Sequence, residues 1–123
     1  MSLLSTEYKT QVKDNRDILI VLVSGVINQS TLILFDDVFC QLRKLRARYV
    51  VLNFAKITDI DSSGMGLLFK GLELLEEYSI CEIVAGSGLQ RMIDYMDHIL
   101  LMTPPRLCKT EEEAVEKIVM TVM

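Results

Sequence analysis

The sequence predicts a single α/β domain, in which about four helices pack on a mixed β-sheet of four to five strands. Three observations predict this class. Apolar runs of strand length recur along the chain, amphipathic helical patterns separate them, and 123 residues make one domain of ordinary size. Strands that alternate with helices imply right-handed crossover connections. We therefore expect residues 1–123 to form one domain.

The first two strands are expected to form a hairpin. Polar and apolar residues alternate over 8–12, which is a weak strand pattern. A turn at 14–17, with the sequence Asp-Asn-Arg-Asp, leads into a continuous apolar strand over 18–24. Gly25 is expected to end this second strand.

Two units of a helix and a strand follow the hairpin. Polar residues at 28–31 predict a helix N-cap, and apolar residues then recur every three or four positions up to Leu45. Residues 49–54 are nearly all apolar, as expected for a strand in the middle of a sheet. A second amphipathic helix should end near Tyr78, before a strand over 80–85.

The last third of the chain predicts two helices with a short edge strand between them. Apolar spacing predicts a helix over 89–96, and the segment 106–109, which follows two prolines, predicts the edge strand. Thr110 and Glu113 have the spacing of a capping box, which predicts a last helix running to about Val122.

The composition argues against several kinds of partner. The net charge is −4, and the one basic cluster, at 43–48, has no aromatic residues to stack bases, so we expect no nucleic-acid binding. No apolar run approaches the roughly 20 residues that span a bilayer, so we expect no membrane insertion. Three widely spaced cysteines form neither a disulfide framework nor a C-x-x-C pair, which is typical of the reducing cytoplasm.

The chain carries no recognisable catalytic, cofactor or metal motif. His98 is the only histidine, so no second histidine completes a metal pair, and we expect it to cap a helix end instead. The sequence Gly86-Ser87-Gly88 lacks the third glycine of a dinucleotide fingerprint and the lysine of a phosphate-binding loop. We therefore interpret it as a turn and expect a protein that is not an enzyme and binds no cofactor.

The most informative segment is 59–69, with the sequence Asp-Ile-Asp-Ser-Ser-Gly-Met-Gly-Leu-Leu-Phe. It places Ser62 and Ser63 at a helix N-terminus, where unpaired N–H groups and a partial positive charge favour an anion. Aspartate and serine are also ordinary N-caps, so the segment has a structural interpretation too. Gly64 and Gly66 each lower the stability of a helix by about 0.5–1 kcal/mol relative to alanine. They also leave bare backbone that a partner can approach, which favours the functional interpretation of the segment.

This segment carries a resemblance to a known family. Residues 50–54 (Val-Val-Leu-Asn-Phe) and 60–66 (Ile-Asp-Ser-Ser-Gly-Met-Gly) resemble the signature of the STAS domain, named for sulfate transporters and anti-sigma-factor antagonists. The resemblance continues through 22–28, before the first helix, and through 89–92 and 110–115, which start the last two helices. The Asp-Ser-Ser-Gly element is fairly specific, and the rest is a general α/β pattern.

The resemblance implies a small regulator that binds an anti-sigma factor, which is also a serine protein kinase. In that family the kinase phosphorylates the first serine after the aspartate, which corresponds here to Ser62, with Ser63 as the second choice. The resemblance implies further partner-binding residues in the helix start and in the preceding loop. These are Asp61, Ser63, Gly64, Met65, Gly25, Asn28 and Ser30.

Other interpretations stay open. STAS modules also resemble cytoplasmic parts of anion and lipid transport systems, so a transporter docking domain or a scaffold member of a signalling complex is the alternative. Asn28 stands where many antagonists carry an aspartate, which makes this loop less acidic than the family pattern. Seven methionines and the apolar run 99–102 either fill the core or form a homodimer patch.

Overall fold

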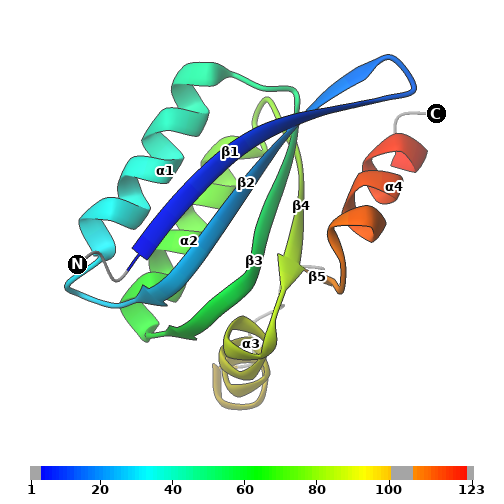
Figure 1. The fold of residues 1–123 in the computed structure, drawn as a ribbon. Helices are drawn as coiled ribbons and strands as arrows, with labels where there is room; N and C mark the ends of the chain where they lie inside the picture. Colours follow the sequence, from blue (N-terminus) through cyan, green and yellow to red (C-terminus); the bar gives the residue numbers. More distant parts are fainter. Residues whose placement is uncertain (1–3, 101–106, 122–123) are drawn as a thin grey trace.

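The structure is a computed structural model that describes residues 4–100 and 107–121, and only the backbone of 96–100. Within these residues it contains five strands and four helices (Figure 1). They follow the order β1 (Leu4–Lys13), β2 (Arg16–Ile27), α1 (Leu32–Leu45), β3 (Tyr49–Ile60), α2 (Ser62–Leu75), β4 (Ile80–Ala85), α3 (Ser87–Leu100), β5 (Leu107–Cys108) and α4 (Glu111–Thr121).

The five strands form one mixed sheet in the order β1-β2-β3-β4-β5. β1 and β2 are antiparallel, and each later pair of neighbours is parallel. A helix connects each parallel pair, because parallel neighbours need a long crossover. The predicted class, a single α/β domain with a mixed sheet and helices packed on it, is confirmed.

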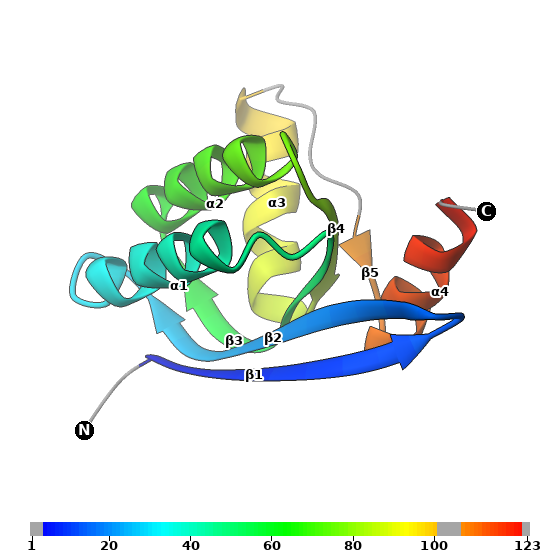
Figure 2. The same cartoon turned by 90° about the horizontal axis from the view of Figure 1, so that it is seen from above.

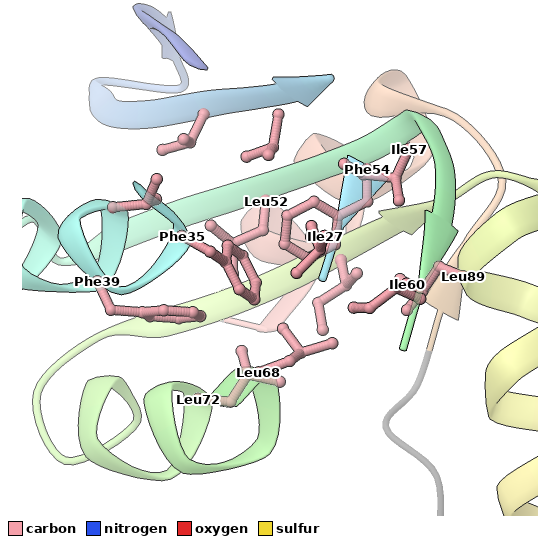
Figure 3. Close-up of a cluster of buried hydrophobic side chains, with 14 of the residues drawn as sticks. Ile27, Phe35, Phe39, Leu52, Phe54, Ile57, Ile60, Leu68, Leu72 and Leu89 are labelled. Atoms are coloured by element: carbon pink, nitrogen blue, oxygen red, sulfur yellow. The ribbon is translucent and has the colours of Figure 1, made fainter. Parts of the chain in front are cut away.

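The helices cover the two faces of the sheet unequally. Figure 2 shows α1, α2 and α3 on one face, and α4 lies against the other. The larger core lies beneath the first three helices, where the ring of Phe35 meets Phe39 and Phe54 edge to face at centroid distances of 5.3 and 5.9 Å (Figure 3). The smaller core joins Ile18, Ile20 and other sheet residues to the apolar side of α4.

The strands β2 and β3, which lead to the first and second helices, are longer than the sequence pattern predicts. β2 does not end at Gly25 but continues to Ile27, and β3 runs past Phe54 to Ile60. Gly25 has φ 114°, a left-handed conformation that glycine tolerates, and the β2–β3 register shifts twice around it. The strand therefore bends and resumes pairing, so that Ile27 lies opposite Ile60.

Smaller differences lie at element ends. β1 begins at Leu4, ahead of the predicted 8–12, and α2 ends at Leu75, before the predicted Tyr78. The predicted edge strand is present but has only two residues. His98 and the apolar run 99–102, which with the methionines suggested a homodimer patch, lie outside the side chains that the structure describes.

The start of α3 packs very close to β3. A Cβ atom at Gly86 would lie 2.3 Å from the carbonyl oxygen of Ala55, and one at Gly88 would lie 2.6 Å from that of Ile57. Side chains larger than hydrogen do not fit there, so the Gly-Ser-Gly sequence serves helix packing at this turn.

Polar contacts fasten α4 to the sheet. Glu111 accepts hydrogen bonds from Lys9 at 2.8 Å and from Asn53 at 3.0 Å, and Lys13 forms an ion pair with Glu116. Burial alone would raise the pKa of Glu111, but the hydrogen bonds from Lys9 and Asn53 and the charge of Lys9 lower it below its ordinary 4.5. A carboxylate with a lowered pKa stabilises the folded state above about pH 4.5, and this contribution is lost as the pH falls through its folded pKa.

We therefore predict that Glu111→Gln lowers the free energy of unfolding at pH 7 by about 1 kcal/mol or less, since the pair is partly exposed. The difference from wild type should be smaller at pH 3 than at pH 7, because protonation of Glu111 as the pH falls below 4.5 removes the charge that its partners stabilise. Denaturant unfolding at both pH values measures it, with the exposed Glu112→Gln as the control. A difference of equal size at both pH values would contradict this explanation.

Candidate functional site

Asp61 joins the end of β3 to the start of α2. Its backbone N–H donates to the carbonyl oxygen of Ile27 at 3.0 Å, across the ends of two neighbouring strands. Its side chain is the N-cap of α2, because Oδ1 accepts from the backbone N–H of Gly64 at 2.9 Å. The same oxygen accepts the hydroxyl of Ser63 at 2.8 Å. One carboxylate therefore fixes the first turn of the helix and one of its two serines.

The two serines differ in how they are held. Ser62, the first residue of α2, is exposed, and its hydroxyl makes no hydrogen bond to the residues that the structure describes. Ser63 is partly buried, and its hydroxyl donates to Asp61. A group that approaches from outside meets Ser62 directly, whereas a reaction at Ser63 first has to break its bond to the cap.

Two of the predicted partner-binding residues, Gly64 and Met65, are buried beneath the start of α2. Met65 is 0 % exposed, and a Cβ atom at Gly64 would lie 2.6 Å from Ile27 Cγ2 and 2.8 Å from Ile60 Cγ1. Both belong to the core, so neither offers a surface to a docked protein. Gly66 is exposed, and a Cβ atom there would meet nothing within 4 Å, so the expectation of bare backbone fits Gly66 and not Gly64.

The loop before α1 is fixed by its own side chains. Asn28 Oδ1 accepts from the backbone N–H groups of Ser30 at 2.9 Å and Thr31 at 3.3 Å, which is an Asx turn. The Thr31 hydroxyl, in a residue that is 3 % exposed, donates to the carbonyl oxygen of Val26 at 2.8 Å. Ser30 is exposed on this loop. Asn28 thus acts as a turn residue, and an acceptor oxygen of aspartate would serve the same purpose.

Gly25 lies within the sheet and not in the loop. It pairs with Leu4 of β1 and Ile57 of β3, and its carbonyl oxygen accepts the hydroxyl of Thr58 at 3.2 Å. Its role in this structure is to bend β2, which places the loop. The structure therefore brings together Asp61, Ser62, Ser63 and the loop of Asn28 and Ser30, because β2 and β3 end side by side (Figure 1).

An apolar surface at the start of α1 was not predicted from the sequence. Ile33 is 84 % exposed and Leu34 is 48 % exposed. The buried residues of this helix, Phe35, Val38, Phe39 and Leu42, follow its apolar spacing. Ile33 and Leu34 precede this stripe and fall outside it, and that departure is the signal that could have identified them.

A hollow of about 320 Å³ lies on the α3 side of the end of β3. Asp59 and Ile60 line it from the strand, and Arg91, Met92 and Tyr95 from the helix. Arg91 donates to the carbonyl oxygens of Ser87 and Thr58, both at 3.3 Å, so its guanidinium is held against the strand end. The segment that carries Ser62 therefore has the apolar start of α1 to one side and this hollow to the other.

Two cysteines, the partly buried Cys81 and the buried Cys108, are poor nucleophiles. Burial, and then the charges of Glu76 and Glu82, raise the pKa of Cys81 to about 12, and burial also raises the pKa of Cys108. Both remain protonated thiols at neutral pH. Across residues 4–95 and 107–121, no three His, Cys, Asp or Glu side chains gather in a way that could hold a metal ion. In the described part of the chain, no helix has both the length and the apolar character to cross a membrane.

Comparison with known proteins identifies the fold. No protein-family model matches the sequence, and no curated protein matches it significantly. Among solved structures, an anti-sigma factor antagonist from Mycobacterium paratuberculosis is 19% identical with a TM-score of 0.73, over 94% of this chain and 95% of that one. The unphosphorylated anti-sigma factor antagonist SpoIIAA is 17% identical with a TM-score of 0.60, over 92% and 98%.

A third structure, the phosphorylated form of the Bacillus cell fate determinant SpoIIAA, is 18% identical with a TM-score of 0.59, over 91% of this chain and 99% of that one. Each match covers nearly the whole of both chains. The resemblance to the STAS domain is therefore confirmed as a resemblance of fold: the chain has the fold of the anti-sigma factor antagonists.

The two glycines at the start of α2 make a matched pair of variants. Gly64→Ala should lower the free energy of unfolding by about 1–3 kcal/mol, because its methyl group overlaps Ile27 and Ile60. Gly66→Ala should raise it by about 0.5–1 kcal/mol, because a helix favours alanine and the position is open. Denaturant unfolding measures both, and equal effects of the two changes would disprove the close packing.

Proposed function

We propose that this protein is a non-enzymatic anti-sigma factor antagonist, switched by phosphorylation of Ser62 by an anti-sigma factor that is also a serine kinase. The observation that carries the proposal is the difference between the two serines, one exposed and one bound to Asp61. The solved structures of this fold support it, since two are described as antagonists and one as a phosphorylated form. ATP and metal would come with the kinase, and this chain would act in the cytoplasm as the acceptor.

The unmodified protein offers a compact contact surface at this end of the sheet. Ser62, Gly66 and Ser30 contribute small exposed groups, and Ile33 and Leu34 contribute apolar area. Exposed apolar side chains of this kind are typical of protein contacts. The fixed loop and the capped helix hold these groups in place before a partner arrives, which reduces the ordering cost of binding.

A phosphate on Ser62 would change the charge of this surface without unfolding it. It adds a charge of about −1.5 to −2 at neutral pH. The N–H groups and partial positive charge at the start of α2 tolerate an anion there. Asp61 and Asp59 are close in sequence, so the modified surface becomes strongly acidic and would repel acids of the partner. Association then ends through charge repulsion.

Phosphate incorporation tests the acceptor. With a serine-kinase anti-sigma factor and ATP, Ser62→Ala should abolish incorporation, because the exposed hydroxyl is removed. Ser63→Ala should retain it, since Ser63 is the hydroxyl bound to Asp61. Circular dichroism of both variants controls for folding. Loss of labelling in Ser63→Ala alone would move the acceptor to Ser63 and refute the proposed geometry.

Binding to the same partner tests the switch. Ser62→Asp should weaken binding by about tenfold or more, because it places a charge within the contact surface. Ser87→Asp is the matched control, since Ser87 is also an exposed serine at the first position of a helix. Equal affinity of both variants and wild type would indicate a constitutive docking module, such as a transporter-associated domain.

A further inference from the structure

The strand β1 forms an edge of the sheet that has no neighbouring strand in the described chain. It is the end strand of the sheet in the described chain, and Figure 2 shows it as the outermost strand. All ten of its residues pair with β2 without a register shift, so no bulge interrupts it, and it contains no proline. Edge strands of this length are usually protected by such features or by charges, because their unpaired backbone groups can pair with another chain.

The charges that would protect this edge are already engaged. Lys9 and Lys13, the two lysines of β1, form ion pairs with Glu111 and Glu116 of α4. Tyr8 and Val12 lie on the opposite side of the strand and are 43 % and 65 % exposed. The edge therefore combines neutralised lysines with exposed apolar side chains.

The turn of the hairpin determines which backbone groups point outward. Asp14 and Asn15 both have positive φ, 51° and 62°, and Lys13 pairs with Arg16, which is a two-residue hairpin. The pair that flanks such a turn exchanges both hydrogen bonds, and bonded pairs alternate along the ladder. Odd-numbered residues of β1 thus bond to β2. Thr6, Tyr8 and Thr10 direct their N–H and C=O groups away from the sheet.

We infer that β1 pairs with β1 of a second copy of this chain, antiparallel and two-fold symmetric about Tyr8. In this register the outward-directed backbone of Tyr8 meets itself, and Thr6 meets Thr10 of the other copy. Glu7 lies opposite Lys9 of the other copy, and Lys9 lies opposite its Glu7. Opposite charges directly across an antiparallel pair stabilise it, and this arrangement supplies two such pairs.

Neighbouring registers are unfavourable. A two-fold axis at Lys9 places two lysines directly opposite each other, and an axis at Glu7 places two glutamates opposite each other. The charges of β1 therefore favour the register about Tyr8 over these two neighbouring registers. Lys9 keeps its contact with Glu111, because its ammonium group has three donors and is half exposed.

This pairing leaves the Ser62 site of each of the two copies accessible. Leu4, at the start of β1, pairs with Gly25 near the end of β2, so β1 starts at the edge of the sheet that carries Ser62. Antiparallel pairing of two copies therefore places the two Ser62 sites at opposite ends of a continuous sheet. The inference does not depend on the proposed phosphorylation, and each can fail without the other.

Sedimentation equilibrium of the whole chain over a range of concentrations tests the pairing. Wild type should form a dimer, and Glu7→Lys should weaken it by about tenfold or more, because it turns both Glu–Lys pairs into Lys–Lys pairs. Glu73→Lys is the control, since it makes the same charge change at an exposed position of α2. A wild type that stays monomeric at its highest soluble concentration overturns the inference, and so does an equal effect of both variants.

Charge complementation separates the interface from general effects on folding. Lys9→Glu should also be monomeric, but it loses the contact with Glu111 as well. Mixed with Glu7→Lys, it should form a heterodimer, because each Lys of one strand then faces a Glu of the other. Failure of the folded variants to associate on mixing would contradict the register. Thr10→Pro, which removes an outward N–H, should weaken the wild-type dimer while leaving the hairpin folded.

Discussion

The hydrogen bonds of Asp61 hold together the end of the sheet that carries Ser62. Its backbone N–H ties the end of β3 to Ile27 of β2, and its carboxylate caps α2 through Gly64. Gly64 lies where any side chain would overlap Ile27 and Ile60, so the helix starts directly on the strand ends. With the strands, the cap and the helix joined at one residue, the first turn of α2 has little freedom.

The cap at Asp61 makes two neighbouring serines chemically different. Both carry the same hydroxyl group, but Ser63 donates a hydrogen bond to Asp61 and Ser62 lies exposed beside it. A kinase needs an accessible hydroxyl. The phosphate that it adds needs unoccupied space and an electrostatic field that does not strongly repel an anion. Ser62 meets these conditions at the helix N-terminus, while its acidic neighbours limit how favourable a further negative charge becomes. The balance suits a reversible modification.

The sequence predicted the class of the fold, the order of its elements and the position of the Asp-Ser-Ser-Gly segment, because apolar periodicity and N-cap residues are local signals. It predicted the ends of β2 and β3 wrongly, since Gly25 bends a strand that local pattern treats as finished. The resemblance listed Met65 among the partner-binding residues, although the orientation of the helix buries it. Such orientation depends on tertiary packing, which spacing alone does not determine.

Other features of the molecule required the structure for the same reason. The exposure of Ile33 and Leu34 depends on which side of α1 meets the sheet. The contacts of Glu111 with Lys9 and Asn53 join residues that are far apart in sequence. The proposed pairing of β1 rests on the hairpin register, which fixes the direction of every backbone group on that edge.

Peptide mass spectrometry of the protein isolated from its own cells is the decisive experiment for the serine switch, because it reports which serine is modified without any introduced change. We expect a phosphate on Ser62 and an unmodified Ser63. A phosphate on Ser63, with Ser62 unmodified, would show that the bond to Asp61 does not protect that hydroxyl and would contradict the proposed switch.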